Sequence, residues 1–204
     1  MATATARLNP VDKHDARRRA LADSALRTLG ELGYAKSSLR EIATNSEFTH
    51  GVVHYYFTDK VDLIIHCVRI YKMRCVSRFE DLVPGARTAE ELLDGFADRL
   101  VDTLTTEAPL HRLWYDLRTQ SFFEDSFRYE VLEMDRTFEE MIWRIVERYA
   151  ELSDSEPALE SQAAYALFDG LFENALLGLL SGDAEAPEHL AERTRWLMPR
   201  LLAR

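Results

Sequence analysis

Residues 38–60 read Ser-Leu-Arg-Glu-Ile-Ala-Thr-Asn-Ser-Glu-Phe-Thr-His-Gly-Val-Val-His-Tyr-Tyr-Phe-Thr-Asp-Lys and predict two short helices joined by a tight turn, then the start of a third. Ser38 and Glu41 have the spacing of a capping box, so a helix can begin at Ser38. Thr49 can cap the second helix, whose apolar face would be Val53, Tyr56 and Phe57. Such a pair is a helix-turn-helix, and its second helix has the size to enter the major groove of DNA.

Over residues 17–64 this pattern resembles the TetR family of bacterial transcriptional regulators. The family has a helical run ending in Gly, a capped helix with Ile-Ala, a turn, and a Gly followed by Tyr-Phe and Lys. The matching residues here are Ala25, Leu29, Gly33, Tyr34, Ser37, Ser38, Ile42, Ala43, Thr49, Gly51, Tyr56, Phe57, Lys60 and Leu63. The resemblance implies a three-helix DNA-binding domain followed by a helical domain that binds a ligand and dimerises. We place these domains at residues 13–60 and 61–204.

Two positions depart from the family pattern. The turn is Ser46-Glu47-Phe48, where the family usually has Ala-Gly-Val, and His54 stands where a Tyr is common. We expect Glu47 to adopt a left-handed or similar turn conformation, which Gly takes more cheaply. Glu47 also places a negative charge near DNA.

The charge of the chain is distributed unevenly. The net charge is −10, but residues 1–60 hold 9 Lys and Arg against 7 Asp and Glu, whereas residues 61–204 hold 16 against 28. The basic groups therefore concentrate around the helix-turn-helix, and an acidic body would repel DNA elsewhere. This modest bias predicts moderate DNA affinity that weakens steeply with salt.

The remaining sequence predicts an all-α protein. Apolar residues recur at helical spacing in 15–32, 59–79, 88–105, from Pro109, and in 124–152, 158–180 and 187–202, which with the helix-turn-helix gives about nine helices and no strand. We find no apolar run of about 18 residues and expect no membrane span. Residues 1–12 lack the apolar core of a signal peptide, which favours a cytoplasmic protein. Cys67 and Cys75, eight apart on one helix, are too far apart for a disulfide and are expected to be reduced.

The predicted helix-turn-helix supplies the candidate DNA contacts. Helix N-termini and short polar side chains bind phosphate, which assigns phosphate contacts to Ser37, Ser38, Thr49 and Lys60. Arg40 would reach phosphate or a base edge. The face of the second helix turned away from its apolar side would read bases through His50, Gly51, Val52, His54 and Tyr55. The alternative is a helical hairpin with a solvated face.

The acidic body is rich in aromatic residues, and most of them can simply form its core. TetR-like proteins hold a small-molecule pocket in this region, so the resemblance implies a ligand site with apolar walls and a few polar groups. The candidate ligand-binding residues are Tyr71, His111, Trp114, Tyr115, Arg118, Phe122, Phe168 and Phe172. The expected effector is apolar, either aromatic or lipid-like.

Residues 158–180 also carry a stripe of small residues spaced four apart, which lets another helix approach closely. Internal packing is one interpretation; a dimer interface is the other, because so apolar a helix needs covering on most of its surface. The last two helices of TetR proteins form a four-helix dimer bundle. The predicted interface residues are Ala166, Gly170, Asn174, Gly178, Leu190, Leu197 and Leu201.

No catalytic or metal motif is recognisable. The sequence has no Gly-x-Ser-x-Gly, no phosphate-binding Gly-rich loop and no His-Glu-x-x-His. His50 and His54 have i, i+4 spacing but no further ligand in register, so we expect no metal and no cofactor. The sequence thus predicts a homodimeric, ligand-responsive regulator, a repressor that binds a near-palindromic operator and is released by a small apolar effector. A helical protein-interaction module without sequence-specific DNA binding is the alternative, and a helical enzyme is a weaker one.

Overall fold

The computed structural model describes residues 10–203, with side chains from His14 onward. The described chain is helical throughout, and the α-helices are α1 (Pro10–Leu32), α2 (Leu39–Thr44), α3 (His50–Tyr56), α4 (Lys60–Ser77), the single turn α5 (Leu82–Gly85), α6 (Ala89–Thr106), α7 (Ala108–Gln120), α8 (Arg128–Leu152), α9 (Ser161–Leu180) and α10 (Ala186–Leu197). Short 3-10 helices, Asp125–Phe127 and Met198–Leu201, precede α8 and follow α10. Apart from α5, these are the nine helices that the sequence predicts, so the all-α fold is confirmed. The expectation about a signal peptide in residues 1–12 falls largely outside the described residues.

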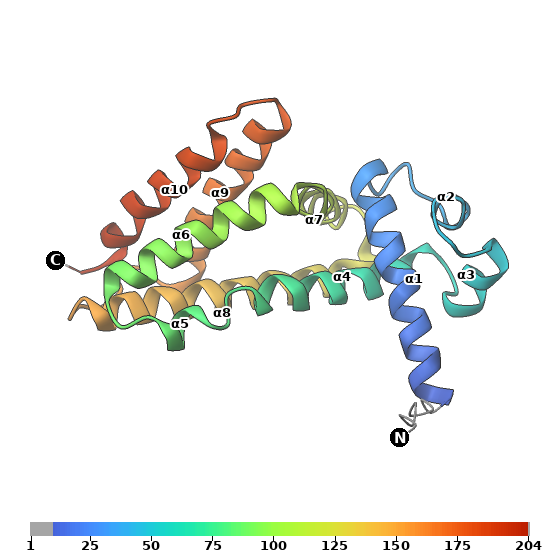
Figure 1. Cartoon of the computed structure of the whole chain (residues 1–204), viewed down its shortest axis with the longest axis horizontal. Helices are drawn as coiled ribbons and strands as arrows, with labels where there is room; N and C mark the ends of the chain where they lie inside the picture. Colours follow the sequence, from blue (N-terminus) through green and yellow to red (C-terminus); the bar gives the residue numbers. More distant parts are fainter. Residues whose placement is uncertain (1–9, 204) are drawn as a thin grey trace, which may run out of the picture.

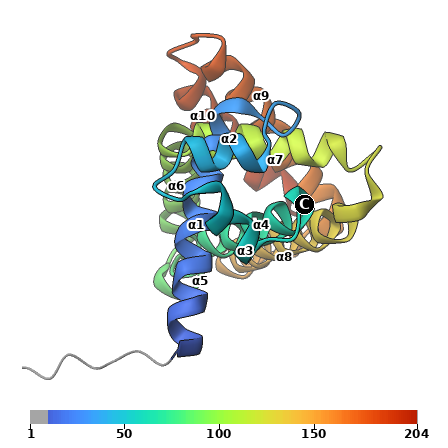
Figure 2. The same cartoon turned by 90° about the vertical axis from the view of Figure 1, so that its right-hand side faces the viewer.

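The helices form a small head and a long body (Figure 1). The helices α1, α2 and α3 lie at one end, and α4 runs from the head along the body beside α8. The helices α6, α9 and α10 pack together on the other side of the body, while α7 crosses the molecule between head and body. Seen from the head end in Figure 2, α1, α2 and α3 lie in front of the body helices.

Short polar side chains fix where several helices begin. Ser38 accepts a hydrogen bond from the N–H of Glu41 at 3.2 Å, and Thr49 accepts one from Val52 at 3.4 Å. Asp59 and Thr88 cap α4 and α6 in the same way. These caps satisfy N–H groups that have no partner within the helix.

Two clusters of buried side chains stabilise the chain. The first joins Leu21, Leu26 and Leu29 of α1 to the helix-turn-helix, to α4, and to Leu113 and Trp114 of α7. The second fills the body between α6, α8, α9 and α10. The first cluster continues through Leu63 and Cys67, so buried packing crosses residue 60. The boundary between 60 and 61 remains a prediction.

The turn between α2 and α3 does not have the conformation that we expected. Among the described residues Asp154 is the one non-glycine with a positive φ, so Glu47 does not adopt the left-handed conformation. The Ser46 hydroxyl shapes the turn instead: it donates to the carbonyl of Ala43 at 3.0 Å and accepts from the N–H of Phe48 at 3.1 Å. A serine side chain can form such local bonds and does not need the glycine backbone. Glu47 itself is exposed.

The helix α9 is more apolar than the sequence analysis allowed. By length and composition alone, Ser161–Leu180 is the one described helix that could cross a membrane. In its apolar stretch, 28% is buried within the protein. A helix packed into a bundle passes the same test, and α9 packs against α8 and α10. Cys67 and Cys75 are free thiols, as predicted, and both are buried.

Candidate functional site

The outer face of α2 and α3 presents an exposed set of side chains. Arg40, His50, Gly51 and His54 are exposed, and the Tyr55 side chain is 73% exposed. Nothing lies within 4 Å of a Cβ placed on Gly51, so this residue leaves open space on the outside of the helix. A surface hollow between the two helices is lined by Arg40, Ala43, Thr44, Phe48, Thr49 and His50. His50, Gly51, His54 and Tyr55 therefore lie on the outward face that the sequence predicted for them.

Three of the predicted DNA contacts are engaged inside the protein. Ser37 is buried and its hydroxyl donates to the carbonyl of Gly33 at 2.6 Å. The Lys60 ammonium bonds the carbonyl of Tyr34 and lies 3.8 Å from the centre of the Tyr34 ring. Val52 is half-buried against the first core cluster. In this structure the Ser37 hydroxyl is therefore turned inward. The half-buried Lys60 ammonium uses one of its three N–H donors within the head, and burial lowers its pKa.

Two histidines converge on the outer face of α3. The Nε2 atoms of His50 and His54 lie 3.1 Å apart, so one ring donates a hydrogen bond to the other. Among the side chains from His14 onward, no group of three His, Cys, Asp or Glu residues could hold a metal ion. The pair is therefore a hydrogen-bonding surface rather than a three-ligand metal site.

The body contains a cavity of about 80 Å³ that is lined largely by buried residues. It lies among α4, α6, α7, α8 and α9, and six of the eight predicted ligand-binding residues line it: Tyr71, His111, Trp114, Tyr115, Phe168 and Phe172. Phe79, Leu100, Phe138, Met141 and Ile142 complete its apolar wall. The volume is enough for a small organic group, and a larger ligand would require the surrounding helices to move.

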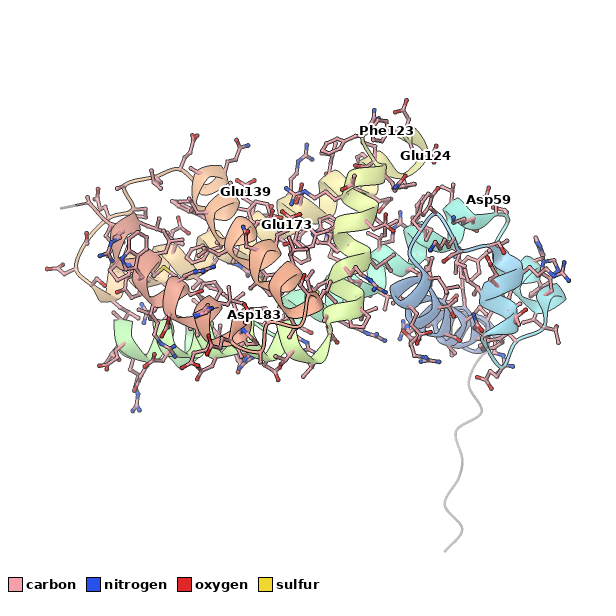
Figure 3. All side chains as sticks on the ribbon, turned by 90° about the horizontal axis from the view of Figure 1, so that it is seen from above. Asp59, Phe123, Glu124, Glu139, Glu173 and Asp183 are labelled. Carbon is pink, nitrogen blue, oxygen red and sulfur yellow. The ribbon has the colours of Figure 1, made fainter. Side chains whose placement is uncertain are left out.

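The other two predicted residues do not line the cavity. Phe122 is 74% exposed in the turn after α7, because the apolar face of α7 ends before it. Phe123 and Glu124 project from the same turn in Figure 3. Arg118 lies behind the cavity wall and reaches it only through its ion pair with Asp169. The assignment of Phe122 to the ligand site is therefore wrong, and that of Arg118 is indirect.

One wall of the cavity is a network of neutral polar groups. The Tyr71 hydroxyl and His111 Nδ1 lie 2.5 Å apart, and His111 Nε2 lies 3.2 Å from the carbonyl of Thr103. Burial lowers the pKa of His111 to about 4, so the ring is neutral near pH 7. A neutral His111 donates from Nε2 to Thr103, which leaves Nδ1 to accept from Tyr71. The Thr103 hydroxyl is buried and has no hydrogen-bond partner among the described residues.

The opposite wall carries charge. Asp169 of α9 lines the cavity, accepts from the Tyr115 hydroxyl at 3.0 Å and pairs with Arg118 at 2.5 Å. Arg118 also pairs with Asp135 of α8 at 3.4 Å, and Asp135 accepts from Tyr165 at 2.6 Å. Burial raises the pKa of Asp135, an effect that Tyr165 and Arg118 oppose.

Sequence analysis missed Thr103, Tyr165 and Asp169. A signal for two of them was available, because Tyr165, Phe168, Asp169 and Phe172 follow i, i+3, i+4 and i+7 spacing on one face of α9. A carboxylate on the buried face of so apolar a helix requires a partner, and such a partner marks a site. Nothing in the sequence distinguishes the Thr103 hydroxyl from those of other helical threonines.

The helix α7 joins this cavity to the head. His111, Trp114 and Tyr115 line the cavity, while Arg112 and Asp116 point to α1 and to the turn after it. Arg112 donates to the carbonyls of Gly30 and Glu31 at the end of α1. A displacement of α7 by a ligand would therefore reach the head directly.

The predicted dimer residues divide into two groups. Ala166 and Asn174 are exposed, and Gly170 has nothing within 4 Å of an added Cβ. The leucines Leu190, Leu197 and Leu201 are buried in the chain's own body, and a Cβ on Gly178 would lie 3.2 Å from Ala186. Assigning the three leucines to a partner is therefore wrong, because they pack within the chain, whereas Gly178 is half-buried against Ala186 and its role stays a prediction. The exposed apolar residues nearby are Leu167, Leu177, Leu180 and Trp196.

An exposed helix-turn-helix on a helical body with a cavity is the arrangement typical of one class of all-α transcription regulators. Residues 21–67 match the model of a family described as bacterial regulatory proteins, tetR family. The head therefore matches the TetR family model, as its sequence predicted, and the chain shares the fold of TetR regulators. A comparison with curated proteins finds no match.

Solved structures share this fold at low sequence identity. A TetR transcription regulator from Haloarcula marismortui has a TM-score of 0.75 and 17% identity, covering 93% of this chain and 100% of its own. The regulator FadR from Bacillus subtilis, in complex with stearoyl-CoA, has a TM-score of 0.73 and 18% identity, covering 88% and 96%. A protein from Saccharomonospora viridis in complex with choline has a TM-score of 0.75 and 16% identity, covering 93% and 100%.

Proposed function

We propose that this protein is a transcriptional repressor that binds a near-palindromic operator as a homodimer and is released when a small effector enters the body. The observation that carries the proposal is the continuous connection from the α3 surface to the cavity. The helices α4 and α7 both line the cavity and both pack against α1 in the head.

The DNA contacts that we propose follow the exposed residues. Arg40, Thr49, His50, Gly51, His54 and Tyr55 face outward from α2 and α3 and would contact phosphate and base edges. Ser38, which caps the N-terminus of α2, would contact phosphate there. Ser37 and Lys60 instead stabilise the head that presents them, through Gly33 and Tyr34.

The dimer that we propose uses the outer face of α9. Leu177 is 65% exposed there and Trp196 of α10 is 59% exposed. Between Leu177 and Leu167 lie Gly170 and Asn174, whose small or short side chains let a partner helix approach. In Figure 3, Glu173 marks this outer surface of α9. A two-fold dimer through this face would place two heads on one side of the molecule to read two half-sites.

The proposed mechanism is a shift between two states. Because the cavity is small, an effector must enlarge it, and the walls that can give way include α4 and α7. Their movement changes the position of the heads, so the effector and the operator prefer different states and each weakens binding of the other. The complexes with stearoyl-CoA and choline show that proteins of this fold bind quite different ligands.

The test is selection from a pool of random-sequence duplexes with the full-length protein. We expect enrichment of sequences related by a near two-fold axis, with half-sites about one helical turn apart. The Tyr55→Ala variant should enrich none of them while remaining dimeric. Enrichment of unrelated sequences, or equal enrichment by Tyr55→Ala, would contradict the proposed reading surface.

A further inference from the structure

Asp169 gives the cavity a charge preference. It is the one charged residue among the described cavity-lining residues, and no Lys or Arg lines the wall with it. Its carboxylate is 14% exposed, held by the Tyr115 hydroxyl and the Arg118 guanidinium. His111 and the Cys75 thiol add no charge, since burial lowers the pKa of the first to about 4 and raises that of the second to about 12.

The charge behind this wall is not balanced. Arg118 is shared between Asp169 and Asp135, so one cation faces two carboxylates. Glu139 lies near Asp135, and Glu173 lies one turn beyond Asp169 on α9. The ionisable groups named here at this wall therefore include more carboxylates than cations. Bringing an anion into the cavity would place like charges together with little water to screen them, which is costly.

The remaining walls suit an apolar cation. Trp114 and Phe138 meet edge to face with their ring centres 5.7 Å apart, and Phe168 and Phe172 follow on α9. Aromatic rings attract alkylammonium groups through the negative charge of their faces. At the neutral wall, Thr103 offers a buried hydroxyl with no partner among the described residues. A buried hydroxyl without a partner is costly, so a ligand that bonds it gains affinity.

We propose that the cavity binds a small organic cation, a tertiary or quaternary ammonium with apolar substituents and one hydrogen-bonding group. Asp169 supplies the countercharge, the aromatic rings enclose the substituents, and Thr103 bonds the polar group. This inference rests on the proposed effector site in the body and assigns its ligand class. A compact cation would require less enlargement of this cavity of about 80 Å³ than a long acyl chain would.

The test compares three compounds of the same shape and different charge by calorimetric titration into the full-length protein. They are choline, its neutral carbon analogue 3,3-dimethylbutan-1-ol, and the anion 3,3-dimethylbutanoate. We expect choline to bind about tenfold or more tightly than the alcohol, and the anion to show no binding. Asp169→Asn should reduce choline affinity about tenfold and leave that of the alcohol unchanged. Glu140→Gln, an exposed carboxylate on α8, is the matched control and should behave as wild type.

Two further variants distinguish a specific loss of choline binding from a loss of folding. Arg118→Gln removes the cation that offsets Asp169, so choline should bind more tightly, which an unfolded variant cannot do. Thr103→Val should weaken choline and the alcohol alike. Equal or tighter binding of the anion, an unchanged choline-to-alcohol ratio in Asp169→Asn, or no binding of any of the three would each overturn the ligand class. Binding of the selected duplex by the same samples without ligand reports the proposed regulator function separately.

Discussion

Asp116 Oδ2 accepts a hydrogen bond from the backbone N–H of Tyr34 at 2.6 Å. This bond joins α7 of the body to the turn that follows α1 of the head. The turn is held in one conformation, because Gly33 has a φ of 80° and a Cβ there would lie 3.1 Å from the same Asp116 oxygen. The Asp116 carboxylate can therefore take this position because Gly33 has no Cβ and because the Tyr34 N–H is available as a donor.

We expect Asp116→Ala to lower the free energy of unfolding by about 1–3 kcal/mol, because it leaves the half-buried N–H of Tyr34 without an acceptor. Urea unfolding at pH 7 measures the loss. Asp125→Ala removes an exposed carboxylate whose ion pair with Arg128 lies on the surface, and it should change stability by less than about 0.5 kcal/mol. Equal effects of the two variants would show that the bond to Tyr34 contributes nothing.

We expect the free energy of unfolding to decrease as the pH falls, because the buried His111 resists protonation in the folded protein. Its pKa is about 4 in the folded protein against 6.5 when unfolded, so between these values the unfolded chain binds a proton that the folded chain does not. Stability is therefore fully present above pH 6.5 and is lost as the pH falls toward 4, by about 2 kcal/mol between pH 7 and pH 5. Urea unfolding of His111→Gln should lack this component. Parallel pH profiles for wild type and variant would contradict it.

We expect Arg40→Ala to weaken operator binding and to reduce the slope of log affinity against log salt by about 1, as loss of one phosphate contact does. Fluorescence anisotropy at several salt concentrations measures both. Arg136→Ala removes an exposed arginine on α8 and should leave the slope unchanged. A wild-type slope for Arg40→Ala would remove this residue from the interface.

We expect Leu177→Asp to dissociate the dimer, because it places an unpaired carboxylate in the centre of the proposed α9 interface. Sedimentation velocity at micromolar concentration should show a folded monomer. Phe123→Asp makes the same kind of change at an 85% exposed side chain in the turn after α7 and should leave the dimer intact. Persistence of a Leu177→Asp dimer would place the interface elsewhere.

The sequence predicted the helices and the outward face of the reading helix because both follow from local patterns. Ser38 caps α2 as its spacing indicated, but Ser37, one residue earlier, turns inward to Gly33. The pattern of Leu190, Leu197 and Leu201 correctly marks an apolar face of α10 and of the 3-10 helix that follows it. The pattern does not show whether that face packs against the same chain or against a partner. In the structure it packs against the same chain. The bond between Asp116 and Tyr34 spans 82 residues and has no local signal.

Genomic capture tests the central claim most directly. Full-length protein is incubated at moderate salt with sheared DNA of its source organism, with and without prior removal of bound small molecules, and the retained fragments are sequenced. The account predicts enrichment of a few fragments that share one near-palindrome, and no enrichment by the Tyr55→Ala variant. No enrichment by the stripped wild-type dimer would contradict sequence-specific operator binding and would favour a helical protein-interaction module.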